Sequence, residues 1–161
     1  MNLDKIADAV KAGVQMAGST KVIHLHGELT KVRPEDSYTE EDGFDESKIK
    51  DVNFGPVSIG DTDDRGVQYR PHIVFFGEAV PKMKDAIAEL AEADFMIIVG
   101  TSLVVQPAAS LWKYTPVDCP VFVVDPKDTP IDNEEGIVHI KEKATVGVAE
   151  AIRMISEMSC E

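Results

Sequence analysis

A histidine directly before a glycine is the first candidate for a catalytic residue in this sequence. It is His26 in the segment VIHLHGEL, with His24 two positions earlier and Gly27 directly after it. An imidazole that is exposed where a strand stops can titrate near neutral pH and act as a general base. A single histidine at a strand end is more often incidental, so these residues alone leave both interpretations open.

Two apolar segments end in residues suited to a nucleotide. IIVGTSLVVQPA leads into Gly100, Thr101 and Ser102, whose backbone N–H groups and hydroxyls suit a ribose or a phosphate. VFVVDP ends in Asp125, and an acid at the carboxyl end of a strand can accept hydrogen bonds from ribose hydroxyls. The alternatives are an ordinary turn and an aspartate that turns the chain before proline. Ligands of open parallel sheets bind outside the carboxyl ends of the strands, where we expect these residues.

The elements that must position these residues can be inferred from apolar patterns. Short β-rich runs predict strands at residues 21–25, 72–76, 95–99, 121–124 and 137–140. Helical periodicity predicts helices at residues 3–16, 81–93, 107–114 and 145–158. From residue 70 onward strands and helices alternate, which is typical of βαβ units. We therefore expect an α/β fold, a partial Rossmann-like parallel sheet with helices on both faces.

The stretch from Pro34 to Gln68 has a different composition. It holds eleven Asp or Glu residues and three Lys or Arg residues, and no apolar period persists through it. We interpret it as a long acidic insertion at the surface, with one hairpin near residues 52–59. A loop of this length in a compact domain is usually functional or a reduced subdomain.

The composition narrows the class of protein and its partners. The formal net charge is −13, which argues against nucleic acid or an anionic membrane as a partner and favours a basic peptide. The two cysteines, Cys119 and Cys160, form no CxxC pair, which argues against a disulfide framework and a cysteine-bound zinc. No apolar run approaches the roughly 20 residues of a membrane span, and the N-terminal segment has no secretory signal pattern. A cytoplasmic location is the default expectation.

Three segments resemble the signatures of sirtuins, the NAD-dependent protein deacylases, and they follow in sirtuin order. They are HLHGELTKVR, RPHIVFFGEAVP and GTSLVVQPAASL, and the resemblance covers roughly residues 17–158. It is strongest to the bacterial, desuccinylase-like branch. The resemblance implies NAD-dependent deacylation of lysine in a protein or peptide, in which the acyl oxygen attacks the nicotinamide ribose. It also implies that His26 is the general base for the ribose hydroxyls.

The resemblance further implies two sets of binding residues. The NAD-binding set is Gly100, Thr101, Ser102, Asp125 and Ala144, and the set that pairs with the substrate peptide and lines its acyl-lysine tunnel is Val74, Phe75, Phe76, Gly77 and Glu78. Asp125 stands where the family has an asparagine, so it keeps an acceptor but loses the amide donor. The acyl group is not indicated.

Several family features are absent from the sequence. There is no Gly-Ala-Gly-Ile-Ser loop and no GxG at all, and Ala9 and Lys11 stand where the family has Asn and Asp. No cysteine lies between residues 33 and 70, where the family's four zinc ligands belong. We therefore expect one truncated sirtuin-like domain over residues 1–161, with residues 34–68 in place of the zinc module, weak NAD binding and no metal. The alternatives are a non-catalytic nucleotide- or acyl-peptide-binding module, one half of a split enzyme completed by a second chain, and a vestigial fragment.

Overall fold

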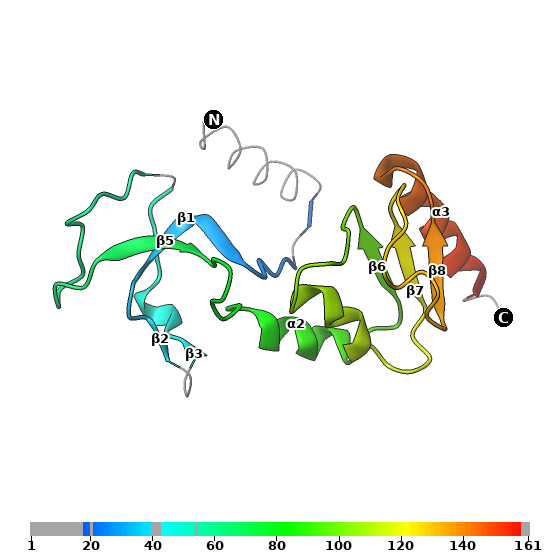
Figure 1. Cartoon of the computed structure of the whole chain (residues 1–161), viewed down its shortest axis with the longest axis horizontal. Helices are drawn as coiled ribbons and strands as arrows, with labels where there is room; N and C mark the ends of the chain where they lie inside the picture. Colours follow the sequence, from blue (N-terminus) through cyan, green and yellow to red (C-terminus); the bar gives the residue numbers. More distant parts are fainter. Residues whose placement is uncertain (1–17, 20, 40–42, 54, 159–161) are drawn as a thin grey trace. The chain divides into compact units, whose positions relative to one another are not determined.

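The chain forms two compact units, which divide after Met83 (Figure 1). The computed structural model describes residues 18–19, 21–39, 43–53 and 55–158. The helix expected at residues 3–16, with Ala9 and Lys11, and the second cysteine, Cys160, lie outside these described residues. The single domain expected over residues 1–161 stays a prediction. Among the described residues, no helix has the length and apolar character that crossing a membrane requires.

The C-terminal unit is built on a three-stranded parallel sheet in the order β6-β7-β8. The strands are β6 (Met96–Val99), β7 (Val121–Val124) and β8 (Ile137–Ile140). All four residues of β7 are buried, as expected of a central parallel strand covered on both faces. These strands confirm the sequence prediction for this part of the chain.

Side chains alternate between the two faces of this sheet and form two apolar clusters. On one face, Phe122 and Val124 pack with Ala151 of helix α3 (Ala144–Met158). On the other, Val121 and Val123 pack with Ile98, Ile131 and Trp112, the last from the 3-10 helix η2 (Ala108–Tyr114). Helices on both faces of a parallel sheet are thus confirmed, although one of them is a 3-10 helix.

A glycine lets α3 lie close to the sheet. A Cβ on Gly147 would lie 2.4 Å from Cγ1 of Val124, so only a glycine allows this separation between helix and strand. The helix expected at residues 81–93 is the shorter α2 (Met83–Leu90), which spans the boundary between the units.

The N-terminal unit contains an antiparallel sheet in the order β4-β1-β5. Its strands are β1 (Gly27–Pro34), β4 (Lys50–Asp51) and β5 (Tyr69–Ile73). A second, two-stranded sheet joins β2 (Tyr38–Thr39) to β3 (Gly43–Phe44), and the 3-10 helix η1 (Glu46–Lys48) follows. Thr62 and Gln68 form an isolated antiparallel bridge.

The strand expected at residues 21–25 is wrong. These residues form no strand, the chain turns at His24–Gly27 with the Gly27 N–H donating to the His24 carbonyl, and β1 begins where the predicted strand ends. KVIHL has strong β propensity but no strand partner among the described residues, whereas GELTKVRP pairs with β4 and β5. Cross-strand pairing therefore outweighs local propensity here.

Two further strand predictions for this unit need correction. The strand expected at residues 72–76 is displaced toward the N-terminus, because β5 pairs with β1 from Tyr69 to Ile73. The described residues of 52–59 form no hairpin, and Val52 instead donates its N–H to the Thr30 carbonyl and so extends the pairing with β1. The hairpin lies instead at β2 and β3, where the rings of Tyr38 and Phe44 are in contact.

Candidate functional site

The carboxyl edge of the parallel sheet brings Gly100 and Asp125 together. Val99 and Val124 are opposite each other in the register of β6 and β7, so the residues that follow them leave the sheet as neighbours. The Gly100 N–H donates to the Val124 carbonyl at 3.0 Å. No atom lies within 4 Å of the position that a Cβ would take on Gly100, so its backbone is open to a ligand.

The two hydroxyl residues after Gly100 are exposed. The Leu103 N–H donates to Oγ1 of Thr101 at 3.2 Å, which shapes the turn after β6. The hydroxyls of Thr101 and Ser102 therefore lie in a short turn directly beyond the strand, as the sequence predicts.

Asp125 is half-buried and holds the start of the loop after β7. Its Oδ1 accepts the Lys127 N–H at 2.9 Å, and its carbonyl oxygen lies 2.9 Å from Nε2 of His139. Among the described residues its Oδ2 has no partner. One carboxylate oxygen thus shapes the turn, as the alternative interpretation of the sequence has it, and the other remains free to accept a hydroxyl.

Ala144 lies at the same edge as Gly100 and Asp125. It is the exposed first residue of α3, four positions after the end of β8, and the three parallel strands point toward this edge (Figure 1). The topology therefore brings together all five residues of the expected NAD-binding set. Their arrangement fits a ribose and its neighbouring groups, because it combines an open backbone, two hydroxyls and a carboxylate acceptor.

His26 belongs to the other unit, where its backbone is held by the antiparallel sheet. Its carbonyl oxygen accepts the Val74 N–H at 3.2 Å, and Gly27 lies opposite Ile73. A Cβ on Gly27 would lie 2.1 Å from the carbonyl oxygen of His72, so a glycine is required at this position. The His26 side chain is exposed. A fixed backbone with an exposed imidazole is an arrangement in which a base can reach a substrate.

His24 differs from His26 in its contacts. It is also exposed, but its Nε2 lies 3.6 Å from Oε1 of Glu28. Neither histidine lies in a strand.

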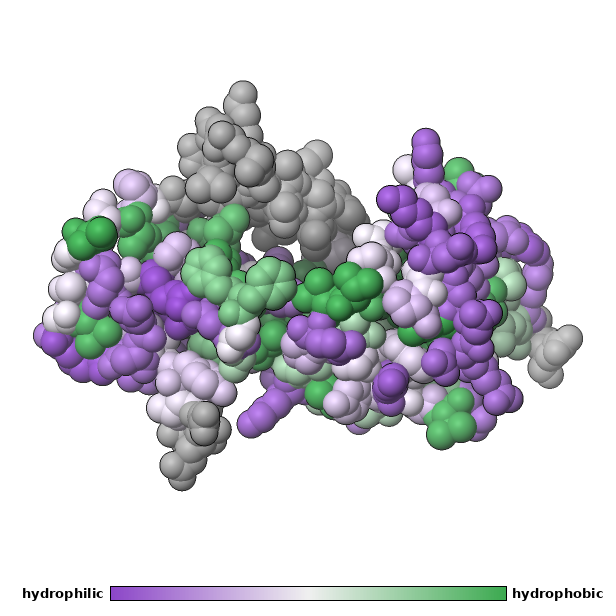
Figure 2. All heavy atoms as spheres, in the orientation of Figure 1, coloured by the Kyte–Doolittle hydropathy of each residue, from purple (hydrophilic) through white to green (hydrophobic). Residues whose placement is uncertain are grey.

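The expected substrate-binding segment, Val74–Glu78, forms a turn rather than a strand. The Glu78 N–H donates to the Phe75 carbonyl at 3.1 Å, and a Glu78 carboxylate oxygen accepts the Phe75 N–H at 2.9 Å. β5 ends at Ile73, so the turn contains residues 74–76, which the sequence analysis predicts as the last part of a strand. Hydrophobic side chains reach the surface in several places (Figure 2), and Phe75 and Phe76 are among them, 61% and 94% exposed.

The Glu78 carboxylate is held by two arginines that sequence reasoning missed. Arg70 donates to both of its oxygens, at 2.5 and 3.1 Å, and the buried Arg33 lies 3.8 Å away. The hydrogen bonds from Arg70, and then that from the Phe75 N–H, hold the pKa of Glu78 below its ordinary value. Glu78 therefore fixes the turn from within, and its carboxylate is engaged with the protein. The sequence gives little indication of this ion pair, because an arginine eight residues before a glutamate is not a recognisable motif.

The acidic stretch is closed by ion pairs and hydrogen bonds. The Arg65 guanidinium donates to both carboxylate oxygens of Asp36, at 2.9 Å each, and to Oδ2 of Asp63. Oδ1 of Asp63 accepts the backbone N–H groups of Arg65 and Val67. The side-chain amide of Gln68 donates to three backbone carbonyls in the same region. In the described part of residues 34–68, no three His, Cys, Asp or Glu side chains come close enough to hold a metal. The residues present do not fit the zinc site of the resembled family.

Comparison with known proteins places these features in a family context. A sequence model of the Sir2 family matches residues 3–107. An NAD-dependent protein deacylase of Bacteroides thetaiotaomicron is 38% identical over 88% of this chain and 59% of its own length. One from Aggregatibacter actinomycetemcomitans is 41% identical over 78% of this chain and 56% of its own length. The chain therefore spans a little over half the length of these relatives.

Solved structures agree with this likeness. A crystal structure of a Sir2 homologue in complex with NAD superposes with a TM-score of 0.65 at 28% identity, over 96% of this chain and 64% of that one. A Sir2 complex with a p53 peptide and NAD+ superposes with a TM-score of 0.59 at 27% identity, over 98% of this chain and 69% of that one.

Proposed function

This chain belongs to the Sir2 family, and on that premise we propose that it acts in NAD-dependent deacylation of protein lysine residues. The observation that carries the proposal is the meeting of Gly100, Asp125 and the start of α3 at one edge of the parallel sheet. Nucleotides bind at such edges in open α/β sheets. The relatives named as NAD-dependent deacylases and the NAD complex of the Sir2 homologue support NAD as the nucleotide.

In this proposal the C-terminal unit binds the ribose and phosphate groups of NAD. The hydroxyls of Thr101 and Ser102 donate hydrogen bonds, Gly100 lets the nucleotide approach the backbone because it has no Cβ, and Oδ2 of Asp125 accepts a hydrogen bond from a ribose hydroxyl. Ala144 lies beside the adenine, where a methyl side chain leaves room for a ring. The sequence has no GxG loop to cradle the pyrophosphate, so we expect NAD binding to be weak.

His26 is the proposed general base. NAD supplies the ribose carbon to which the acyl oxygen bonds as nicotinamide leaves. The imidazole of His26 accepts a proton from a ribose hydroxyl. The hydrogen bond from the Val74 N–H to its carbonyl keeps the backbone of this residue in place.

The proposed macromolecular substrate is a peptide that carries an acylated lysine. Among the described residues β5 is an edge strand of its sheet, and beyond Tyr69, whose N–H donates to the Asp61 carbonyl, its outer side can take an extended peptide by strand addition. The turn Val74–Glu78 follows directly, with exposed aromatic rings at Phe75 and Phe76 that can contact the acyl-lysine side chain. The net charge of −13 favours a lysine-rich partner, and a cytoplasmic location remains part of the proposal.

A second candidate is a module that binds a nucleotide or an acyl-peptide without turnover. The absence of a GxG loop and the aspartate at position 125 in place of an asparagine favour it. A second chain that completes the enzyme is a variant of the first proposal.

The experiment incubates the 161-residue chain with acetyl-lysine or succinyl-lysine peptides and NAD, and measures nicotinamide and deacylated peptide by mass spectrometry. We expect NAD-dependent turnover that His26→Ala lowers by about 10²–10⁴-fold, the usual contribution of a general base. His24→Ala is the matched control, since it removes a second exposed imidazole from the same turn. Equal losses in the two variants would contradict the role of His26. If the chain binds NAD without turnover, the result supports the binding module. If it shows no NAD binding and no turnover, both functions are refuted.

A further inference from the structure

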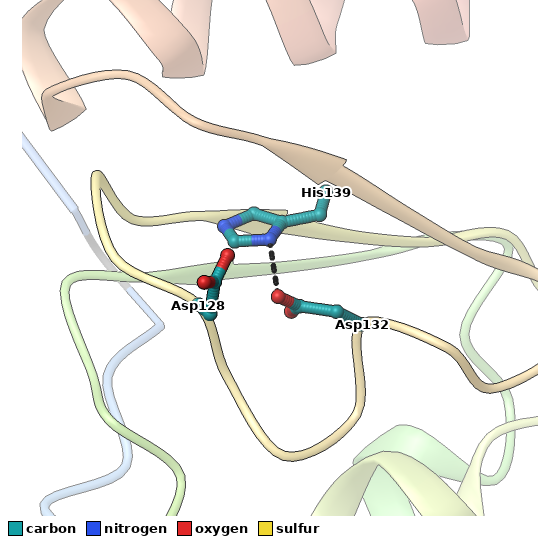
Figure 3. A group of neighbouring side chains, drawn as sticks. All are labelled: Asp128, Asp132 and His139. Atoms are coloured by element: carbon teal, nitrogen blue, oxygen red, sulfur yellow. Dashed lines mark ion pairs between the residues drawn. The ribbon is translucent and has the colours of Figure 1, made fainter.

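Three side chains that the proposed function does not use gather in the C-terminal unit. Asp128 and Asp132 come from the loop between β7 and β8, and His139 comes from β8 itself. One ligand atom from each lies within 4.8 Å of the others. Both carboxylates approach the imidazole ring from the loop (Figure 3).

The hydrogen bonding of His139 determines which of its nitrogens carries a proton. Nε2 lies 2.9 Å from the carbonyl oxygen of Asp125, and because a carbonyl only accepts, Nε2 is the N–H. In the neutral ring Nδ1 then presents a lone pair. The His139 side chain is only 6% exposed, and Nδ1 is buried beside the carboxylate of Asp132.

This lone pair faces negative charge. Nδ1 lies 2.8 Å from Oδ2 of Asp132. Thr129 donates its N–H at 2.9 Å and its hydroxyl to the two oxygens of Asp132, which holds this carboxylate in a fixed orientation. A buried lone pair beside a fixed carboxylate is unfavourable unless a proton or a metal ion lies between them.

Asp128 adds a second carboxylate and Lys141 adds one positive charge. Oδ1 of Asp128 lies 2.5 Å from Nζ of Lys141, and the Asp128 side chain is 80% exposed. Two carboxylates and one ammonium leave the group with one net negative charge while the imidazole is neutral. The exposed Asp128 can exchange Lys141 for another cation with little change in the fold.

The arrangement matches that of a metal ligand rather than that of a surface ion pair. Histidines that bind metals nearly always donate the other ring N–H to a backbone carbonyl or a carboxylate, as His139 does to Asp125. At metal–ligand distances of about 2.1 Å, neighbouring octahedral ligands are about 3.0 Å apart, close to the observed separation of Nδ1 and Oδ2. One imidazole with two carboxylates suits Mn²⁺, Fe²⁺ or Co²⁺ better than Ca²⁺ or Mg²⁺, which prefer oxygen ligands alone.

We propose that Asp128, Asp132 and His139 bind a divalent transition-metal ion. The ion joins the loop after β7 to β8. The ion is linked to Asp125 through His139, whose Nε2 is hydrogen-bonded to the Asp125 carbonyl oxygen. This site is independent of the proposed deacylase function and of the acidic stretch at residues 34–68.

The test is a titration of the metal-free full chain with Mn²⁺, followed by calorimetry and by paramagnetic broadening of amide NMR signals. We expect one bound ion, with broadening centred on residues 128–141. Asp132→Asn and His139→Gln should each weaken Mn²⁺ binding at least about tenfold. Loss of a residue that only hydrogen-bonds to a metal ligand typically weakens metal binding about 10–100-fold, and loss of a ligand should weaken it at least as much. Asp128→Asn should also weaken binding, and because this side chain is exposed the variant will fold.

Two further variants separate a metal site from general attraction of cations. Asp118→Asn removes one exposed acid before β7, at the opposite edge of the same sheet, and should leave Mn²⁺ affinity unchanged. Lys141→Gln frees Asp128 from its ion pair and should tighten Mn²⁺ binding about two- to fivefold, as expected for an exposed pair of this kind. The proposal is overturned if Mn²⁺ does not bind, or if the ligand variants weaken binding no more than Asp118→Asn. In either case His139 and Asp132 form only an ion pair through a protonated imidazole.

Discussion

Replacement of Gly27 by alanine should destabilise the N-terminal unit selectively. Gly27 has φ of +88°, and a Cβ on it would lie 2.1 Å from the carbonyl oxygen of His72, a residue of the paired strand β5. A real Cβ needs at least 3.0 Å, so β1 and β5 would have to separate by roughly 1 Å at this point. The same shift would move the backbone of His26, which pairs with Val74.

The size of the effect follows from two contributions. An alanine in the left-handed region costs about 1–2 kcal/mol. Separation of the strands also weakens the contact between Gly27 and Ile73 and the hydrogen bond from Val74 to His26, at about 1 kcal/mol for each hydrogen bond lost. The total is about 2–4 kcal/mol, a large part of the 5–15 kcal/mol that stabilises an ordinary domain.

Gly77→Ala is the matched control, because Gly77 has the same φ of +88° but no atom within 4 Å of its Cβ position. Hydrogen exchange gives a separate measurement for each unit. In the Gly27 variant the amides of β1 and β5 should exchange about two to three orders of magnitude faster, those of β6, β7 and β8 should be unchanged, and the control should show only the smaller backbone cost. If the two variants destabilise the unit equally, the close approach to His72 is not the reason for glycine at position 27.

Three other predictions concern charged residues. Asp125→Ala should weaken NAD binding several-fold in calorimetry, because it removes the oxygen Oδ2 that is proposed to accept a ribose hydroxyl; unchanged binding would contradict the role of this residue. Arg65→Ala should speed hydrogen exchange at residues 58–68, because Arg65 joins Asp36 to Asp63, and since we expect no zinc in this stretch, EDTA should leave exchange in the wild type unchanged. As the pH falls through the lowered pKa of Glu78, its carboxylate should protonate and the Phe75 N–H should lose protection, with the contribution fully present above the ordinary pKa of the group. Glu78→Gln should remove this pH dependence, and a dependence that persists would assign it to another group.

The C-terminal unit shows how much local sequence can predict. The continuously apolar runs that become β6, β7 and β8 are typical of parallel strands covered on both faces, and the periodic segment after them becomes α3. Because parallel strands place their carboxyl ends at one edge, the sequence also predicted that Gly100 and Asp125 would meet there.

The N-terminal unit shows where local sequence is insufficient. β1 pairs with β5, whose residues lie about forty positions later, so the bounds of both strands depend on each other rather than on their own β propensity. For the same reason KVIHL is not a strand, His26 lies at a strand's beginning, and Val74–Glu78 is a turn.

The parallel sheet, the helix that covers it and the family to which the motifs point can all be predicted from the amino-acid sequence. The contacts of Arg33 and Arg70 with Glu78, the closing of the acidic stretch by Arg65 and the approach of Asp128 and Asp132 to His139 appear only in the folded chain. Apolar periodicity is a local property of the chain, so it can be read residue by residue. Ion pairs and ligand clusters instead join side chains whose separation in sequence is arbitrary, so they exist only once the fold has set their distances.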